Sequence, residues 1–211
     1  MRRRIFFLFF LLNSMLASAQ YPGYTLLANQ VDFKDPFTNA SQKMNSIQSD
    51  FVQEKNLSML SEKIVSKGKF WYKKNNLVRM EYEQPFQYLM VLNNGNIYIK
   101  DGQKENKVSA KSNKLFQQIN QIIVDCMNGS ALSNSEFDSR VFEGKTSFLI
   151  ELTPRSKTIR DLFQHINLFI DKKDYTASEI DMMEPGGDNT IIHFTNKQLN
   201  SNLPDALFAI H

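Results

Sequence analysis

The sequence predicts a single α+β domain in which roughly ten antiparallel strands follow one another along the chain, with two helices inserted. Three observations favour this class. Short segments alternate apolar and polar residues, two longer stretches repeat apolar residues with a helical period, and no repeat, linker or low-complexity block divides the chain. We therefore expect one compact core rather than several domains.

The N-terminus has the three parts of a secretory signal peptide. Arginines at positions 2–4 precede an apolar run over residues 5–12, and the small residues 17–19 form a cleavage site. The run is too short for a membrane-spanning helix, so a retained anchor is the weaker interpretation. Cleavage after Ala19 would leave one domain, residues 20–211, beginning at Gln20 instead of the cysteine that a bacterial lipoprotein needs. We expect an exported, soluble and unlipidated protein.

The composition excludes a strongly charged partner. The formal net charge of +3 comes from the three arginines of the leader, and without them 22 basic residues balance 22 acidic ones. This balance argues against a nucleic-acid or anionic-membrane binder. A single cysteine, Cys126, excludes an intramolecular disulfide, so the fold must rest on its hydrophobic core.

The first helix is expected to begin at Asp35 and Pro36, which form a typical N-cap and first helical position. Apolar residues then recur at helical spacing, and we expect the helix to end near Ile47 where the chain turns into a strand. The residues with this spacing are Phe37, Ala40, Met44, Ile47 and Phe51, the last of them beyond the expected helix end.

Five strand segments are expected between residues 49 and 101. They cover about residues 50–56, 64–73, 77–83, 88–92 and 97–100, and polar turns separate them. Asn94-Gly95 between two apolar runs is a strong hairpin signal.

A second helix is expected over residues 112–129. Its apolar face contains Leu115, Phe116, Ile119, Ile122, Ile123 and Cys126, and Gly129 is expected to end it. Five further strands follow at about residues 139–142, 148–153, 166–171, 177–184 and 190–195, with a short helical turn near residues 158–163.

The sequence offers no recognisable catalytic set. His165, His193 and His211 are far apart and lack metal-ligand spacing, and neither a nucleophile elbow nor a phosphate-binding glycine loop is present. Cys126 lies on an apolar helical face, where a buried thiol is the simplest interpretation. We expect no enzyme activity, no cofactor and no metal, although carboxylates from separate strands could still form a site.

Two neighbouring segments read GKFWYKKNNLVRMEYEQP at residues 68–85 and YLMVLNNGNIYIKD at residues 88–101. Together they resemble the LolA family of periplasmic outer-membrane lipoprotein carriers. FLIELTP (148–154), HINLFIDKKDYTASEIDM (165–182) and LPDALF (203–208) are also similar to family segments, the last to its terminal strand. The chain departs from the family at two positions. Lys74, followed by Asn75, stands where the family has an arginine before a proline, and Met80 stands where the family has a tryptophan.

The resemblance implies an α+β fold, a half-open antiparallel β-barrel of about eleven strands with helices forming a lid over an apolar cavity. It also implies a monomeric carrier that takes acylated lipoproteins from an inner-membrane ABC transporter to an outer-membrane acceptor. Each acyl CH₂ exposed to water costs about 0.8 kcal/mol, so such an anchor needs an escort. The alternatives are a carrier of another lipid or biosynthetic intermediate, an outer-membrane acceptor, which Gln20 disfavours, and a secreted hydrolase.

Strand alternation and the resemblance together predict three sets of site residues. The expected cavity lining is Phe70, Tyr72, Val78, Met80, Tyr82, Met90, Leu92, Ile166, Leu168 and Ile170. The expected lid is Phe37, Met44, Ile47, Leu115, Ile119, Ile122 and Ile123. By resemblance, Lys74 is the candidate latch that holds the lid shut.

Overall fold

The structure is a computed structural model that describes residues 21–60, 62–93, 95–102, 104–109, 121–125 and 129–210, the side chains of 104–109 excepted. The expected signal peptide, Leu115, Phe116, Ile119 and Cys126 lie outside these residues. Within the described part, no helix is both long and apolar enough to cross a bilayer.

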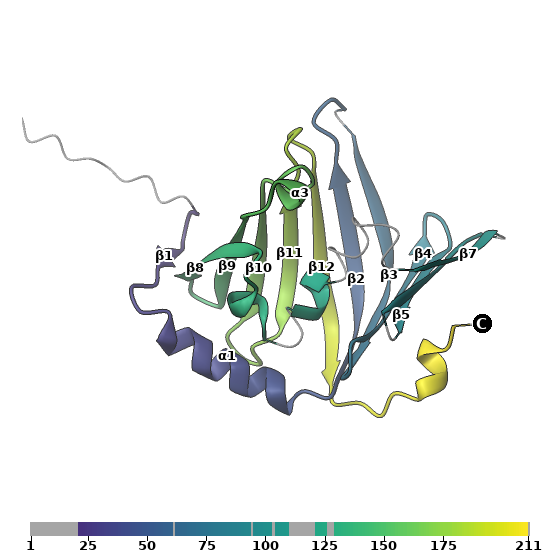
Figure 1. The fold of residues 1–211 in the computed structure, drawn as a ribbon, viewed down its shortest axis with the longest axis horizontal. Coiled ribbons are helices and arrows are strands. Elements are labelled where there is room, and N and C mark those ends of the chain that lie inside the picture. Colours follow the sequence, from purple (N-terminus) through teal and green to yellow (C-terminus); the bar gives the residue numbers. More distant parts are fainter. Residues whose placement is uncertain are drawn as a thin grey trace, which may run out of the picture.

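One antiparallel sheet of 12 strands forms the body of the molecule, in the order β1-β8-β9-β10-β11-β12-β2-β3-β4-β5-β6-β7. The strands are β1 (Thr25–Leu26), β2 (Ser46–Asn56), β3 (Lys63–Lys73), β4 (Leu77–Gln84), β5 (Tyr88–Asn93), β6 (Asn96–Asp101), β7 (Lys104–Ser109), β8 (Phe137–Glu143), β9 (Ser147–Pro154), β10 (His165–Asp171), β11 (Ala177–Met183) and β12 (Asn189–Leu199). The sheet curves around the helical segments, and its edge strands β1 and β7 stand apart (Figure 1). The half-open barrel expected from the resemblance is confirmed.

All ten strands expected from alternation are present, whereas β1 and β7 were not predicted. β1 has two residues, too few to show a period, and β7 reads KENKVS, which is mostly polar. The prediction of a terminal strand at LPDALF is wrong, because Asp205–Phe208 forms a short 3-10 helix, η3. Pro204 precedes it and has no N–H for a strand ladder.

Helix α1 (Val31–Lys43) begins one turn earlier than expected and contains Pro36 in its interior. The reason is aromatic packing: Phe33 and Phe37 are fully buried and stack with ring centroids 5.0 Å apart. Phe33 also lies 4.7 Å from Phe148 of β9, so the apolar face extends towards the N-terminus. α1 lies across one end of the strands (Figure 1).

The second expected helix is described only at residues 121–125, which are helical. Gly129 has a φ of 71°, the left-handed conformation that favours glycine. The amide of Ser130 donates to the carbonyl of Asp125 at 3.0 Å, the long bond of a Schellman motif. This geometry agrees with a helix end at Gly129.

Two hydrophobic clusters occupy the two faces of the sheet. The larger cluster fills the concave face and includes Phe51, Phe70 and Met80. The smaller cluster lies on the outer face, where Leu203 and Phe208 of the C-terminal segment pack on Val91 and Tyr98. The strands therefore carry apolar contacts inside and outside, but only the concave face is apolar along most of its length.

Candidate functional site

A cavity of about 540 Å³ lies between the concave face of the sheet and two covering segments. This volume falls within the roughly 300–1,000 Å³ of typical ligand sites. Its lining residues are Gln53, Lys55, Met80, Tyr82, Tyr88, Met90, Ile123, Asp161, Leu162, Phe163, Met182, Glu184, Pro185, Gly186, Thr190 and Ile192. The lining is therefore mostly apolar at its walls and polar at one end.

One wall comes from the β4–β5 hairpin. Alternation places Met80 and Tyr82 on the inner face of β4, and the register pairs them with Met90 and Tyr88 of β5. The rings of Tyr82 and Tyr88 meet edge to face at 5.4 Å. Two thioethers beside two aromatic rings make a wall whose side chains can adapt to different contents.

The opposite wall comes from β11 and β12, which contribute Met182 and Ile192. Two segments cover the space between the walls: the helical residues 121–125 contribute Ile123, and the turn after α3 (Lys157–Arg160) contributes Leu162 and Phe163. The amide of Phe163 donates to the carbonyl of Ile159 at 2.8 Å, which holds this turn in place. The cavity is thus roofed by chain that is separate from the sheet.

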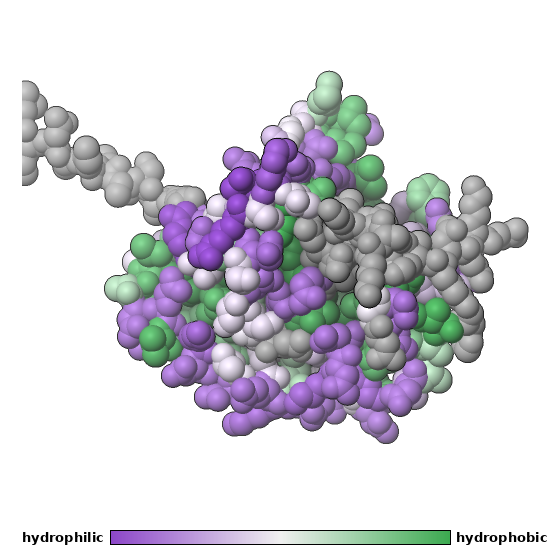
Figure 2. Space-filling view, viewed as in Figure 1, coloured by the Kyte–Doolittle hydropathy of each residue, from purple (hydrophilic) through white to green (hydrophobic). Residues whose placement is uncertain are grey.

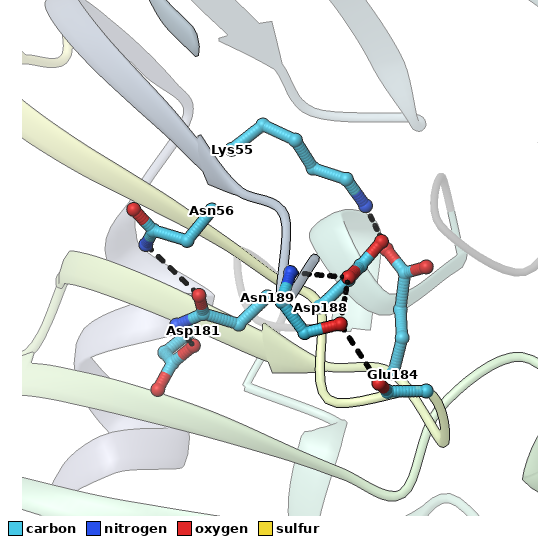
Figure 3. Close-up of polar contacts among 8 residues, drawn as sticks. Lys55, Asn56, Asp181, Glu184, Asp188 and Asn189 are labelled. Atoms are coloured by element: carbon cyan, nitrogen blue, oxygen red, sulfur yellow. Dashed lines mark hydrogen bonds and ion pairs between the residues drawn. The ribbon is translucent and has the colours of Figure 1, made fainter. Parts of the chain in front are cut away.

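The polar end of the cavity lies where the β2–β3 and β11–β12 turns approach each other. Lys55 of β2 forms an ion pair with Glu184, which follows β11 (Figure 3). Beyond this pair, the backbone N–H of Ser58 donates to the carboxylate of Asp188 at 2.7 Å. The side-chain amide of Asn56 donates to the side-chain oxygen of Asn189 at 2.9 Å. These contacts tie the two hairpins together at the mouth.

The tyrosines of the site are held neutral. Burial raises the pKa of Tyr82, and the hydroxyl of Tyr82 donates to the amide oxygen of Gln53 at 2.9 Å. Burial, and then the charge of Asp101, raise the pKa of Tyr88. Neither phenol ionises at physiological pH, so the wall that they form stays uncharged.

A family model described as "Outer membrane lipoprotein carrier protein LolA" matches residues 42–211, which is most of the chain. The chain belongs to the LolA family. No curated protein sequence matches it.

Solved structures share the fold of this LolA-family chain at low sequence identity. An uncharacterized conserved protein from Thermus thermophilus has 11% identity and a TM-score of 0.52, covering 85% of this chain and 93% of its own. The Pseudomonas aeruginosa MucA/MucB complex has 19% identity and a TM-score of 0.50, covering 84% of this chain and 60% of the matched chain.

The residues expected to line the cavity lie together in the concave cluster, at different depths. Met80, Tyr82 and Met90 line the cavity itself. The others are buried in the surrounding core: Phe70, Tyr72, Val78, Leu92, Ile166, Leu168 and Ile170. The LolA-family chain therefore has a cavity above a packed floor, and three of the ten named side chains reach the open space.

The residues expected to form the lid lie in different places. Ile122 and Ile123 are buried, and Ile123 lines the cavity, whereas Phe37 of α1 and Met44, which caps α1, are buried without lining it. Placing Ile47 on the helix was wrong. It lies in β2 opposite Tyr72, because α1 ends at Lys43 and the apolar spacing continues into the strand. Leu115 and Ile119 lie outside the described residues.

Lys74 follows β3 and reaches the C-terminal end of α1. Its ammonium donates to the carbonyl of Gln42 at 3.1 Å, and its amide donates to the carbonyl of Asn45 at 2.8 Å. A cation near the last carbonyls of a helix is also favoured by the helix dipole. Lys74 thus joins the β3–β4 turn to the helix that closes this end of the sheet.

The sequence reasoning missed the second wall and the mouth. Met182 and Ile192 could have been found, because they alternate with Ile180 and Phe194 on their strands. The contact of Lys55 with Glu184 joins residues 129 positions apart, and no local pattern indicates it.

Proposed function

We propose that this chain is a periplasmic carrier that holds the acyl chains of lipoproteins in the concave cavity and shuttles them from the inner to the outer membrane. In this proposal it is soluble after cleavage of residues 1–19. It receives cargo from an inner-membrane ABC transporter and delivers it to an outer-membrane acceptor without enzymatic chemistry. The observation that supports it most is the roofed cavity with adaptable apolar walls.

The uncharged walls suit cargo that must later be released. Met80, Met90 and Met182 offer flexible thioethers, which bind acyl chains without one fixed geometry. Burial keeps the pKa of Tyr82 raised, so no charge opposes an acyl chain there. The ion pair of Lys55 and Glu184 at the mouth would face the polar part of the cargo.

The mouth also carries exposed apolar side chains. Met59 and Leu60 of the β2–β3 turn are 94% and 60% exposed, and Phe86 of the β4–β5 turn is 77% exposed. Apolar residues are visible at the tip of the β2–β3 hairpin (Figure 2). Exposed apolar groups beside a lipid cavity would contact the membrane or the acceptor when cargo leaves.

Lys74 is the proposed latch. Its bond to Gln42 is a single contact from a flexible ammonium, whereas an arginine offers a planar fork that can bind several carbonyls. The latch of this chain is therefore expected to open more easily than one made by arginine.

Native mass spectrometry of the protein purified from its own periplasm tests the proposal. We expect a bound mass equal to an acylated lipoprotein, and loss of that mass in Ile123→Asp with retention in the exposed-site control Ile64→Asp. A bound glycolipid or free lipid would support the alternative carrier function. Protein without any bound lipid, both from cells and after incubation with acylated peptide, would contradict both.

A further inference from the structure

A polar groove of about 280 Å³ lies on the outer face of β12, β2 and β3, on the side of these strands that faces away from the cavity. By alternation, its side chains come from positions between the inward-facing residues. They are Gln48, Asp50, Lys69, Trp71, Asn196 and Gln198, and the buried Ser49 between two of them also borders the groove. The proposed lipid site uses none of them.

Trp71 forms one wall of this groove. The guanidinium of Arg79 lies over its ring at 5.7 Å from the centroid. In the register, Trp71 pairs with Arg79 of β4 on one side and with Gln48 of β2 on the other. The indole lines the groove and also packs against the outer apolar cluster of Val91, Tyr98, Leu203 and Phe208. The part of the ring that borders the groove is a platform for a flat ligand with C–H groups.

Four planar polar side chains border the groove beside the indole. The amide of Gln48 donates to Gln198 at 2.8 Å, and the amide of Asn196 donates to Asp50 at 2.7 Å. Each bond fixes two side chains but uses only one polar atom of each. The other polar atom of each of these four side chains can bond a ligand, so the groove presents both donors and acceptors.

The backbone of β12 is specially shaped at this site. The pairing with β2 shifts register between Thr195 and Gln198, and Asn196 has a φ of 53°. This bulge places Asn196 on the same face of the sheet as Asp50. The next residue, Lys197, does not bond within the groove but donates to the hydroxyl of Thr176 at 2.6 Å. Bulges commonly re-aim side chains at binding sites.

We propose that this groove binds an uncharged saccharide, with one sugar ring stacked on Trp71 and its hydroxyls bonded to Gln48 and Gln198. Vicinal hydroxyls need neighbouring donors and acceptors, which the two glutamines provide. Lys69 forms an ion pair with Glu83 at 3.8 Å, and Asp50 accepts from Asn196, so the groove carries one charge of each sign, each with a partner, and does not select an ion. The volume of about 280 Å³ lies just below the roughly 300 Å³ at which typical ligand sites begin, so the groove suits a small ligand, and its polar side chains favour a saccharide over an acyl chain.

Trp71 makes the proposal directly testable, because it is the chain's one tryptophan. Tryptophan fluorescence of the full mature chain is titrated with maltotriose and, separately, with triacetylchitotriose. We expect a saturable change with at least one of them. The double variant Gln48→Ala/Gln198→Ala should raise that Kd about tenfold, since two hydrogen bonds are lost. Gln164→Ala, an exposed glutamine outside the groove, should leave the Kd unchanged.

Two results would overturn the proposal. One is the absence of a saturable change with either saccharide up to about 10 mM, which corresponds to negligible affinity. The other is an unchanged Kd in the double variant, provided that circular dichroism shows it folded. Amide chemical-shift changes confined to residues 48–50, 69–71 and 196–198, and not to residues 53–55 and 190–192, separate groove binding from an effect on the cavity. The outcome is independent of whether the cavity carries lipid.

Discussion

The inner and outer faces of β2, β3 and β4 are made of the same strands but have opposite chemistry. Phe70 and Tyr72 point inwards and are buried, whereas Trp71 between them points outwards beside Arg79. On β4, Val78 and Met80 are buried inside, and Arg79 donates to Glu81 and to the carbonyl of Leu207 outside. Strand alternation thus gives one sheet an apolar interior and an exterior on which polar side chains stand beside a smaller apolar cluster.

This difference between the two faces shows which side chains of the sheet can rearrange. On the inner face, stabilisation comes from non-directional burial, so a cavity can open or fill without breaking a specific bond. On the outer face, side chains bond to named partners, such as the amide of Asn93 to the carbonyl of Phe208 at 2.9 Å. We therefore expect changes inside to affect cargo and stability strongly, and changes outside to act locally.

The largest expected effect is a charge placed against the cavity. Ile123→Asp puts a carboxylate on a side chain that is 3% exposed, at a cost of several kcal/mol whenever the roof is closed. Retention of a fluorescent acyl chain should fall at least tenfold, while far-ultraviolet circular dichroism still shows the sheet. Ile64→Asp adds the same charge at an exposed site and should retain the ligand. Equal retention in both variants would contradict the roof.

The next effect tests how tightly the inner face is packed. A Cβ at Gly68 would lie 2.0 Å from the carbonyl oxygen of Glu81 and 2.9 Å from the ring of Phe51, so β3 and β4 could not keep their spacing. Gly68→Ala should lower the free energy of unfolding by about 1–3 kcal/mol or more. Gly186→Ala, with nothing within 4 Å of its Cβ, is the matched control. If both variants unfold at the same urea midpoint, β3 and β4 can move apart at little cost and the prediction of tight packing at Gly68 is wrong.

An alkaline titration sharpens the comparison further. Burial raises the pKa of Tyr72 from 10.0 to about 12. Its burial in the neutral form stabilises the fold fully below pH 10, and this contribution is lost as pH rises towards 12, because the unfolded chain ionises first. Tyr72→Phe should therefore unfold less readily between pH 10 and 12. The difference in tyrosinate absorbance between the wild type and Tyr72→Phe isolates this one phenol among the seven tyrosines, and a difference that already appears near pH 10 would argue against the burial.

The smallest expected effect on stability is at Lys74, in the β3–β4 turn. Lys74→Leu removes one exposed bond to Gln42 and should change the free energy of unfolding by less than about 0.5 kcal/mol. The rate of acyl-chain transfer to acceptor vesicles should nevertheless rise, because α1 is held less firmly. Lys43→Leu, in the last turn of the same helix, is the control. If transfer is unchanged relative to this control, Lys74 is only a surface lysine.

The sequence by itself determined the strands and the direction in which their side chains point. Val78, Arg79 and Met80 could be assigned to faces because the period of a strand is fixed by its backbone geometry. Helix boundaries were harder: α1 starts early because Phe33 packs on Phe148, a contact 115 residues away in the chain. Ile47 fits a helical spacing and a strand equally well, and only its pairing with Tyr72 decides between them.

The tertiary structure alone decided where space was left between these elements. The cavity exists because the curved sheet brings β4 and β5 opposite β11 and β12, so that Met80 and Met182 face one open volume. The pairing of Lys55 with Glu184 and the alignment of Gln198 with Gln48 also depend on that curvature and register. Twist accumulates over many strands and bulges, and such a sum is not encoded in the period of any one segment.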